Sequence, residues 1–174
     1  YYVEDVAAAA GALYLSDGIN GLRVYDISTI ESPRVAGSLE NVRYNGRLAV
    51  SGGYLYDTLL DGGLAVYDIS ERFAPREVAL LNLPGRAADV DLVGNRLYLC
   101  NGGGGLSIVD VSNPRSPSIL STLSTTATDG SLSQSTYYVA SDFSGLLAVD
   151  VSNPRDPGVK DRRRTLGVAR SLEV

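Results

Sequence analysis

The sequence contains no histidine, which removes every site that depends on an imidazole. Histidine-ligated metals, Ser-His-Asp triads and imidazole general bases are therefore excluded. A single cysteine, Cys100, allows neither an intrachain disulfide nor a cysteine-rich zinc site. Methionine is also absent and position 1 is Tyr1, so we expect a chain that is processed or cut from a longer one.

Long apolar runs and an excess of positive charge are missing as well. No apolar run approaches the roughly 20 residues that a membrane-spanning helix needs. The 174 residues carry 15 basic and 20 acidic side chains, and this balance disfavours nucleic acid as a partner because phosphate binding needs a basic face. The 19 glycines and 7 prolines, with 44% hydrophobic residues, are typical of a folded β-protein with many turns.

What the sequence does contain is an internal repeat. The pattern Gly-Leu-x-x-x-Asp-Val/Ile-Ser occurs four times, at residues 21–28, 63–70, 105–112 and 145–152. Its aspartates are spaced by 42, 42 and 40 residues, and a proline turn follows each copy. A fixed period of this length indicates a repeat architecture. The predicted units are residues 1–42, 43–84, 85–126 and 127–166, followed by 167–174 as the first strand of a further unit.

Each unit divides into four short strands joined by hairpin turns, and no segment shows a sustained helical period. In the third unit the strands are expected at about 87–93, 96–100, 106–111 and 118–123. The third strand is apolar on both faces, which is typical of a sheet packed between two others. Four-stranded sheets of about 40 residues that stack around an axis form a β-propeller. The predicted fold is therefore an all-β propeller of four-stranded antiparallel blades.

The pattern Gly-Leu-x-Val-x-Asp-Val-Ser-Asn-Pro-x-x-Pro, clearest at residues 105–117 and 145–157, resembles the LVIVD repeat. The resemblance spans essentially the whole chain, although residues 29–32 and 71–74 depart from the Asn-Pro-x-x part. It implies a β-propeller of bacterial or archaeal proteins, often exported or cell-surface. The resemblance also implies a binding and scaffolding module, with no shared catalytic residues to carry over.

Both ends of the chain are in the phase of a first strand, at residues 4–7 and 170–174. We therefore expect a segment of a larger propeller, with a ring closed by two copies as the alternative. An open arc of blades would expose the outer faces of the first and last blades. The predicted cover is further blades of the same polypeptide, a protein partner or a second copy in a homo-oligomer.

The four repeated aspartates, Asp26, Asp68, Asp110 and Asp150, raise the question of a metal or catalytic site. They lie on different blades, third from the axis, so they cannot converge there. We interpret each as an acceptor for backbone N–H groups of the following turn.

The loops between second and third strands offer little more. Asp17 and Asn20 are weak metal candidates, without the alternating acids of an EF-hand. Residues 101–105 are interpreted as a glycine-rich turn because they lack the Lys-Ser/Thr and following helix of a phosphate loop.

The loops that lead from one unit to the next open on the same face, around the mouth of the central tunnel. They supply a mixture of Arg, Tyr and Asp that is typical of recognition surfaces, with a solvated rim as the alternative. The candidate binding residues are Arg43, Tyr44, Arg47, Arg86, Asp89, Asp91, Asp129 and Arg170.

Three further features are interpreted as structural. The tyrosines of the second and third strands are expected in the core between blades, at positions 14, 25, 56, 67, 98 and 138. The charged segment 160–164 falls on the fourth strand of the last unit, where charges protect a sheet edge; docking onto an acidic partner is the alternative. Cys100 is expected to be a small buried hydrophobe with no adjacent base.

Two classes of function remain. The favoured one is a non-catalytic binding or scaffold module, extracellular, periplasmic or on the cell surface, with no cofactor. The alternative is a propeller enzyme of the lyase or lactonase type, working at the tunnel mouth with Tyr and Arg or a loop-bound metal. The lack of histidine, together with an expected lack of a converging acid pair, favours the binding module.

Overall fold

The computed structural model describes residues 3–39, 44–142, 144–169 and 171. Among these residues it contains β-strands and one short 3₁₀ turn, η1 (Gly18–Asn20), and no α-helix. The strands form four antiparallel sheets of four, each in simple chain order. The prediction of an all-β propeller with four-stranded antiparallel blades is therefore confirmed.

The strand bounds show the repeat directly. The first blade holds β1 (Asp5–Ala9), β2 (Ala12–Ser16), β3 (Leu22–Asp26) and β4 (Arg34–Leu39). The second holds β5 (Asn45–Ser51), β6 (Tyr54–Leu59), β7 (Gly63–Asp68) and β8 (Arg76–Asn82). The third holds β9 (Asp89–Val93), β10 (Arg96–Cys100), β11 (Leu106–Asp110) and β12 (Ser118–Leu123). The fourth holds β13 (Asp129–Ser133), β14 (Thr136–Ser141), β15 (Gly145–Asp150) and β16 (Gly158–Arg163).

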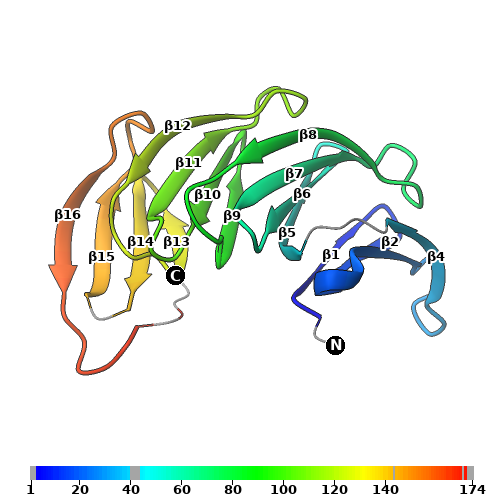
Figure 1. Ribbon diagram of the computed structural model, residues 1–174, viewed down its shortest axis with the longest axis horizontal. Coiled ribbons are helices and arrows are strands. Elements are labelled where there is room, and N and C mark those ends of the chain that lie inside the picture. Colours follow the sequence, from blue (N-terminus) through cyan, green and yellow to red (C-terminus); the bar gives the residue numbers. More distant parts are fainter. Residues whose placement is uncertain (1–2, 40–43, 143, 170, 172–174) are drawn as a thin grey trace.

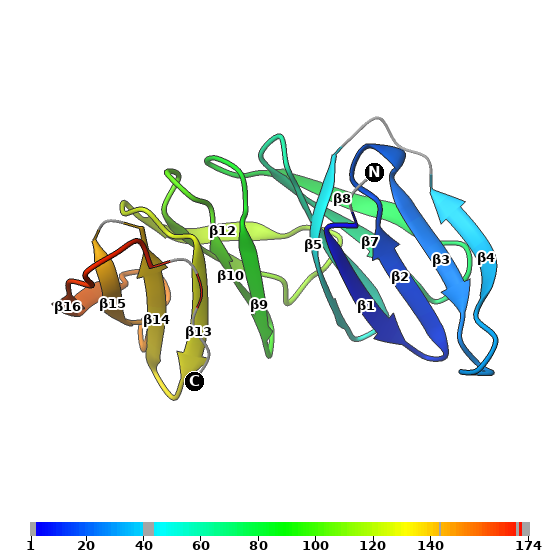
Figure 2. The same ribbon diagram turned by 90° about the horizontal axis from the view of Figure 1, so that it is seen from below.

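The four blades stand side by side in an open arc (Figure 1). The first strand of each blade lies on the concave side and the fourth on the convex side; Figure 2 shows β13, β9, β5 and β1 following one another along the concave side. We call the face with the loops between second and third strands, and between blades, the loop face. The opposite face, with the turns between first and second and between third and fourth strands, is the turn face.

Three apolar clusters hold the blades together, one at each junction between neighbours. Equivalent positions repeat in them: Tyr14, Tyr56 and Tyr98 from the second strands are all buried. Leu22, Leu64 and Leu106 from the third strands are also buried. The interpretation of the strand tyrosines as core is confirmed at these positions and at Tyr67, whereas Tyr25 and Tyr138 are only partly buried.

The two end faces of the arc explain the exceptions. Val6 on the first blade is 50% exposed, whereas Leu48, at the equivalent position of the second blade, is 8% exposed. On the fourth blade Tyr138 and Leu146 are partly exposed, although their equivalents at the three junctions are buried. Both end faces therefore carry the apolar pattern of a junction without a neighbouring blade. What covers them stays a prediction.

The segments that follow the third and the fourth blades form equivalent β-bridges. Ala127, just before β13, forms a β-bridge with Gly102, and Ala169 forms the corresponding bridge with Asp142. Residues 170 and 172–174, where most of a further first strand is expected, lie outside the described residues. No helix in the described part of the chain has the length and apolar character needed to cross a membrane.

Two local predictions can be checked against the fold. The glycine-rich segment 101–105 is a packing turn, since a Cβ on Gly104 would lie 1.7 Å from the Pro84 carbonyl oxygen. The charged segment begins on β16, where all six residues are exposed at the outer edge of the last blade. Both segments are placed as the sequence predicts.

Candidate functional site

The inner rim of the loop face is built from one repeated position. Asp5, Asp89 and Asp129 are the first residues of β1, β9 and β13, and Arg47 holds the corresponding place in β5. The spacing of 42, 42 and 40 residues brings these four positions to the same height on neighbouring innermost strands. We call these four residues the inner rim.

Three of the four fasten one blade to the next. The Asp5 carboxylate accepts a hydrogen bond from the Leu48 N–H at 2.8 Å, and the Asp89 carboxylate accepts one from the Gly130 N–H at 3.1 Å. The Arg47 guanidinium donates to two backbone carbonyls, of Ala88 on the third blade at 2.9 Å and of Glu4 beside the first blade at 3.2 Å. These charges satisfy backbone groups across the junctions.

The expectation that no acid pair converges is wrong. The carboxyl groups of Asp89 and Asp129 meet at the junction of the third and fourth blades, where both accept the Gly130 N–H, at 3.1 and 3.0 Å. Burial, followed by the Asp129 hydrogen bond and charge and by the charge of Asp91, raises the pKa of Asp89 to about 7, against the opposing Gly130 N–H. The two acids are 40 residues apart in sequence, and the repeat spacing is the signal that would have brought them together.

Behind this pair lies a buried phenol and thiol. The Tyr137 hydroxyl is 3.9 Å from the Cys100 sulfur, and its ring stacks on Tyr98 with centroids 4.9 Å apart. Burial raises the pKa of the Cys100 thiol and of the Tyr137 phenol, so both stay protonated. Cys100 is therefore the buried hydrophobe that the sequence predicts. Gly130 makes room for the phenol, because a Cβ there would lie 2.4 Å from the Tyr137 ring.

A second buried acid was not predicted. Asp57 on β6 is fully buried and accepts hydrogen bonds from the Asn45 side-chain amide and from the Gly46 N–H. Burial raises its pKa to about 7, although both hydrogen bonds oppose the shift. The sequence signal is an aspartate at a position where the equivalent residues are Leu15 and Leu99.

A small cavity of about 170 Å³ opens beside the inner rim between the first three blades. Arg47 and Arg86 line it, together with Glu4, Leu60 and the small residues Gly46, Ala87 and Ala88. Arg86 is exposed, and its side chain has no ion pair or hydrogen bond with the described residues. Tyr44 is half exposed, and its carbonyl accepts the N–H of Leu60, one of the lining residues.

The predicted binding residues thus fall into separate groups. Arg47 and Arg86 share the small cavity, and Asp89 and Asp129 form the acid pair with Asp91 beside it. Arg43 and Arg170 lie outside the described residues.

The metal candidates of the first blade are engaged with their own loop. The Asp17 carboxylate forms an ion pair with Arg23 at 2.7 Å, and Asn20 closes the η1 turn. Across the described ranges, no group of three or more acidic or cysteine side chains is placed to hold a metal ion.

The repeated aspartates behave as the sequence predicts. Each accepts the N–H of the serine two residues later, at distances of 2.9, 3.0, 2.8 and 3.0 Å along the chain. This hydrogen bond is the main cause that lowers the pKa of each of the four carboxyl groups. They are turn-forming residues on the turn face, far from the inner rim.

The family comparison matches the entire repeat region. A family model described as the LVIVD repeat matches residues 2–40, 43–82, 84–125 and 127–165. The comparison with curated proteins finds no match.

Solved structures share the fold at low identity. The chain is similar to the periplasmic gluconolactonase PpgL of Pseudomonas aeruginosa, with 19% identity and a TM-score of 0.85 over 99% of this chain and 56% of that one. It is similar to a functionally unknown protein from Desulfotomaculum acetoxidans DSM 771 (8%, TM-score 0.77, 97% and 58% covered) and to the computationally designed Ika8 protein (12%, TM-score 0.76, 97% and 51% covered). The chain spans little more than half the length of these three proteins, and at such identities the likeness concerns the fold alone.

Proposed function

The chain belongs to the LVIVD-repeat family, and from that premise we propose that it is a non-catalytic binding module, the interaction propeller of an exported or cell-surface protein. The observation that supports this proposal most is that the inner-rim charges bond the backbone of neighbouring blades. Asp5, Arg47 and Asp89 bond backbone groups of neighbouring blades, so they hold the innermost strands in place. A rim fixed in this way leaves recognition to the side chains around it.

The binding surface in this proposal is the small cavity at the loop face. Arg86 is available to an incoming acceptor, and Arg47 adds a second positive charge beside it. A guanidinium binds a carboxylate through two parallel hydrogen bonds. A volume of about 170 Å³ accommodates one acidic group of a larger partner rather than a whole small-molecule substrate. The proposed partner therefore presents a carboxylate on a protein or glycan surface.

A second candidate is a hydrolase of the lactonase type. The observation in its favour is the Asp89–Asp129 pair, because a carboxyl group with a pKa near 7 suits general acid–base catalysis. The similarity to a protein titled a gluconolactonase adds to it at the level of the fold. Against it, one Asp89 oxygen already accepts the Gly130 N–H, so the pair is part of the blade junction.

One substrate separates the two candidates. The purified chain is incubated with D-glucono-δ-lactone, with and without added Ca²⁺, Mg²⁺ or Zn²⁺, and acid release is followed by titration. The binding module predicts the rate of buffer alone. Saturable acceleration that is lost in Asp89→Asn and in Asp129→Asn would overturn the proposal in favour of the hydrolase.

The carboxylate site has its own test with D-gluconate as the probe. Titration of the ¹⁵N-labelled chain is expected to shift the backbone amides of Arg47, Arg86 and Ala88 in a saturable way. Arg86→Ala should abolish these shifts, whereas Arg76→Ala, an exposed arginine on the outer strand β8, should not. Shifts that persist in Arg86→Ala would place the site elsewhere.

A further inference from the structure

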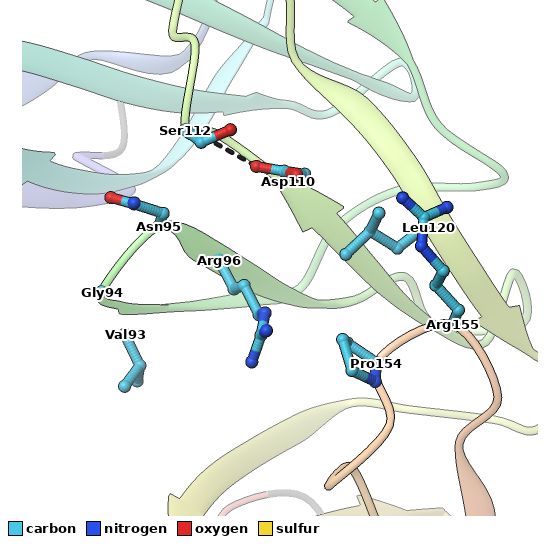
Figure 3. Close-up of a pocket in the computed structure, with 9 residues that line it drawn as sticks. All are labelled: Val93, Gly94, Asn95, Arg96, Asp110, Ser112, Leu120, Pro154 and Arg155. Atoms are coloured by element: carbon cyan, nitrogen blue, oxygen red, sulfur yellow. Dashed lines mark hydrogen bonds between the residues drawn. The ribbon is translucent and has the colours of Figure 1, made fainter.

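A larger cavity lies on the turn face, where the third and fourth blades meet (Figure 3). Its volume is about 450 Å³, within the range of ligand-binding pockets. Arg96 and Asp110 line it from the third blade, and Arg155 enters from the turn between β15 and β16 of the fourth. Aliphatic side chains complete the lining: Val93, Leu120 and Pro154.

The cavity holds two guanidinium groups and one carboxylate. Arg96 and Asp110 face each other in the pairing of β10 with β11, and Arg155 approaches the same carboxylate from the next blade. One Asp110 oxygen accepts the Ser112 N–H, as Figure 3 shows. Neither arginine side chain forms an ion pair or hydrogen bond with the described residues. The cavity therefore contains one positive charge without a counterpart.

At the equivalent place between the second and third blades, the arginine from the later blade is ion-paired. Arg115 occupies the position of Arg155 and forms an ion pair with Asp68 at 2.9 Å. The position of Arg96 is held by Tyr54, which is uncharged, and the second guanidinium that acts on Asp68 comes from Arg76, its register partner on β8.

Between the first and second blades, an arginine bonds the backbone of the neighbouring blade instead. Arg72 donates to the Ala10 carbonyl at 3.0 Å, and its guanidinium covers the Phe73 ring at 4.5 Å from the centroid. Ala12 stands where the third blade has Arg96. An arginine at this second-strand position is thus specific to the third blade, whereas in the first two blades the arginine opposite the turn aspartate, Arg34 or Arg76, lies on the fourth strand.

We propose that this cavity binds the carboxylate of an acidic side chain in a peptide segment of a partner protein. The carboxylate supplies the missing negative charge between Arg96 and Arg155, and the aliphatic lining receives apolar neighbours of the acidic residue. A singly charged carboxylate fits better than a phosphate, because Asp110 repels a doubly charged anion more strongly. The site is separate from the loop-face cavity, so neither proposal depends on the other.

The probe is the capped tripeptide acetyl-Leu-Glu-Leu-amide, titrated into the ¹⁵N-labelled chain. We expect saturable shifts of the amides of Gly94, Asn95 and Ser112, and binding at least about 10-fold tighter than for acetyl-Leu-Gln-Leu-amide. Charge-assisted hydrogen bonds of about 1.5–3 kcal/mol correspond to a loss of roughly 10- to 100-fold for Arg96→Ala and for Arg155→Ala. Arg115→Ala is the matched control and should bind like the native chain.

A fourth variant separates ligand binding from a structural role. In Asp110→Asn the side-chain oxygen still accepts the Ser112 N–H, but the competing negative charge is gone. The glutamate peptide should then bind several-fold tighter, an effect that a purely structural role of the two arginines does not produce. Acetate serves as the free-acid arm and should bind at least about 10-fold more weakly than the peptide, since it lacks the apolar contacts.

Four results would each overturn the proposal. They are the absence of saturable shifts at millimolar peptide, equal binding of the Glu and Gln peptides, native affinity in both arginine variants, and an equal loss in Arg115→Ala. Thermal unfolding of each variant provides the folding control, because all three arginines are exposed and are expected to be replaceable without loss of the fold.

Discussion

The junction between the third and fourth blades can be compared with the two junctions before it. In the middle all three are alike, with a buried tyrosine from a second strand and a buried leucine from a third strand at equivalent positions. At the ends they differ. On the turn face Arg72 and Arg115 bond across the first two junctions, whereas Arg155 does not bond across the last.

The inner ends of the junctions differ in the sign of their charges. The first has the acids Asp5 and Asp57, the second has Arg47, and the third has the Asp89–Asp129 pair. The apolar middle provides the cohesion, so the polar ends are free to vary among repeats. A charge that bonds a neighbouring blade serves the fold, and a charge left without such a bond is available to a ligand.

The largest expected effect concerns the shared apolar middle. Leu64→Ala and Leu106→Ala should each lower the free energy of unfolding by about 4 kcal/mol, because they remove fully buried side chains. Leu146→Ala, at the equivalent position on the end face of the fourth blade, should cost less than about 1.5 kcal/mol if the chain alone leaves that face in solvent. Urea unfolding measures all three. An equal cost for Leu146→Ala would mean that a second copy or a partner covers that face.

The next largest effect is the pH dependence of stability that comes from Asp57, the buried acid of the first junction. The pKa of Asp57 is 3.8 without the protein environment and is raised to about 7 by burial, so the folded chain keeps its proton at higher pH than the unfolded chain. The stability from this group is complete below about pH 4 and is lost as the pH rises to about 7. Between pH 5 and pH 8 the loss amounts to ~3 kcal/mol.

Asp57→Asn removes this titration while keeping an oxygen that accepts from Asn45. The variant should therefore be more stable than the native chain at pH 8 and show a flatter dependence on pH in urea unfolding. Asp26→Asn is the control, because the Ser28 N–H lowers the pKa of that carboxyl, so it titrates only in acid and its removal should leave the slope between pH 5 and pH 8 unchanged. The same slope in Asp57→Asn as in the native chain would contradict the assignment.

The smallest effect compares the arginines of the turn face. Arg115→Ala removes an exposed ion pair and should cost up to about 1 kcal/mol. Arg155→Ala removes a side chain without such a pair and should change the stability by less than about 0.5 kcal/mol. Thermal unfolding at low salt measures both. A larger cost for Arg155→Ala would show that its guanidinium supports the junction.

The repeat in the sequence predicted the fold well because period, strand pattern and turns all depend on local residues. The same spacing also predicts the inner rim. Its four residues follow the period of the repeat: Asp5, Arg47, Asp89 and Asp129. What the local pattern lacks is the direction of each side chain across a junction. The meeting of Asp89 with Asp129 and the burial of Asp57 depend on the neighbouring blade, so they required the structure.

The fourth blade gives a second example of a contact that the sequence pattern does not show. Its first strand is polar and contains Gly130, yet it pairs normally with β14. The glycine is needed because the Tyr137 ring of β14 fills the space of a side chain there. The sequence alone does not show that these two residues are in contact.

Arg72 and Arg115 bond a neighbouring blade, whereas the three arginines assigned to ligands, Arg86, Arg96 and Arg155, form no ion pair or side-chain hydrogen bond with the described residues. The most direct test is the ¹⁵N spectrum of the arginine Nε–H groups during titration with acetyl-Leu-Glu-Leu-amide and, separately, with D-gluconate. We expect shifts of the Arg96 and Arg155 signals with the peptide and of the Arg86 signal with gluconate, while the Arg72 and Arg115 signals stay in place in both titrations. Shifts of Arg72 and Arg115 as large as those of Arg96 and Arg155 would contradict this assignment.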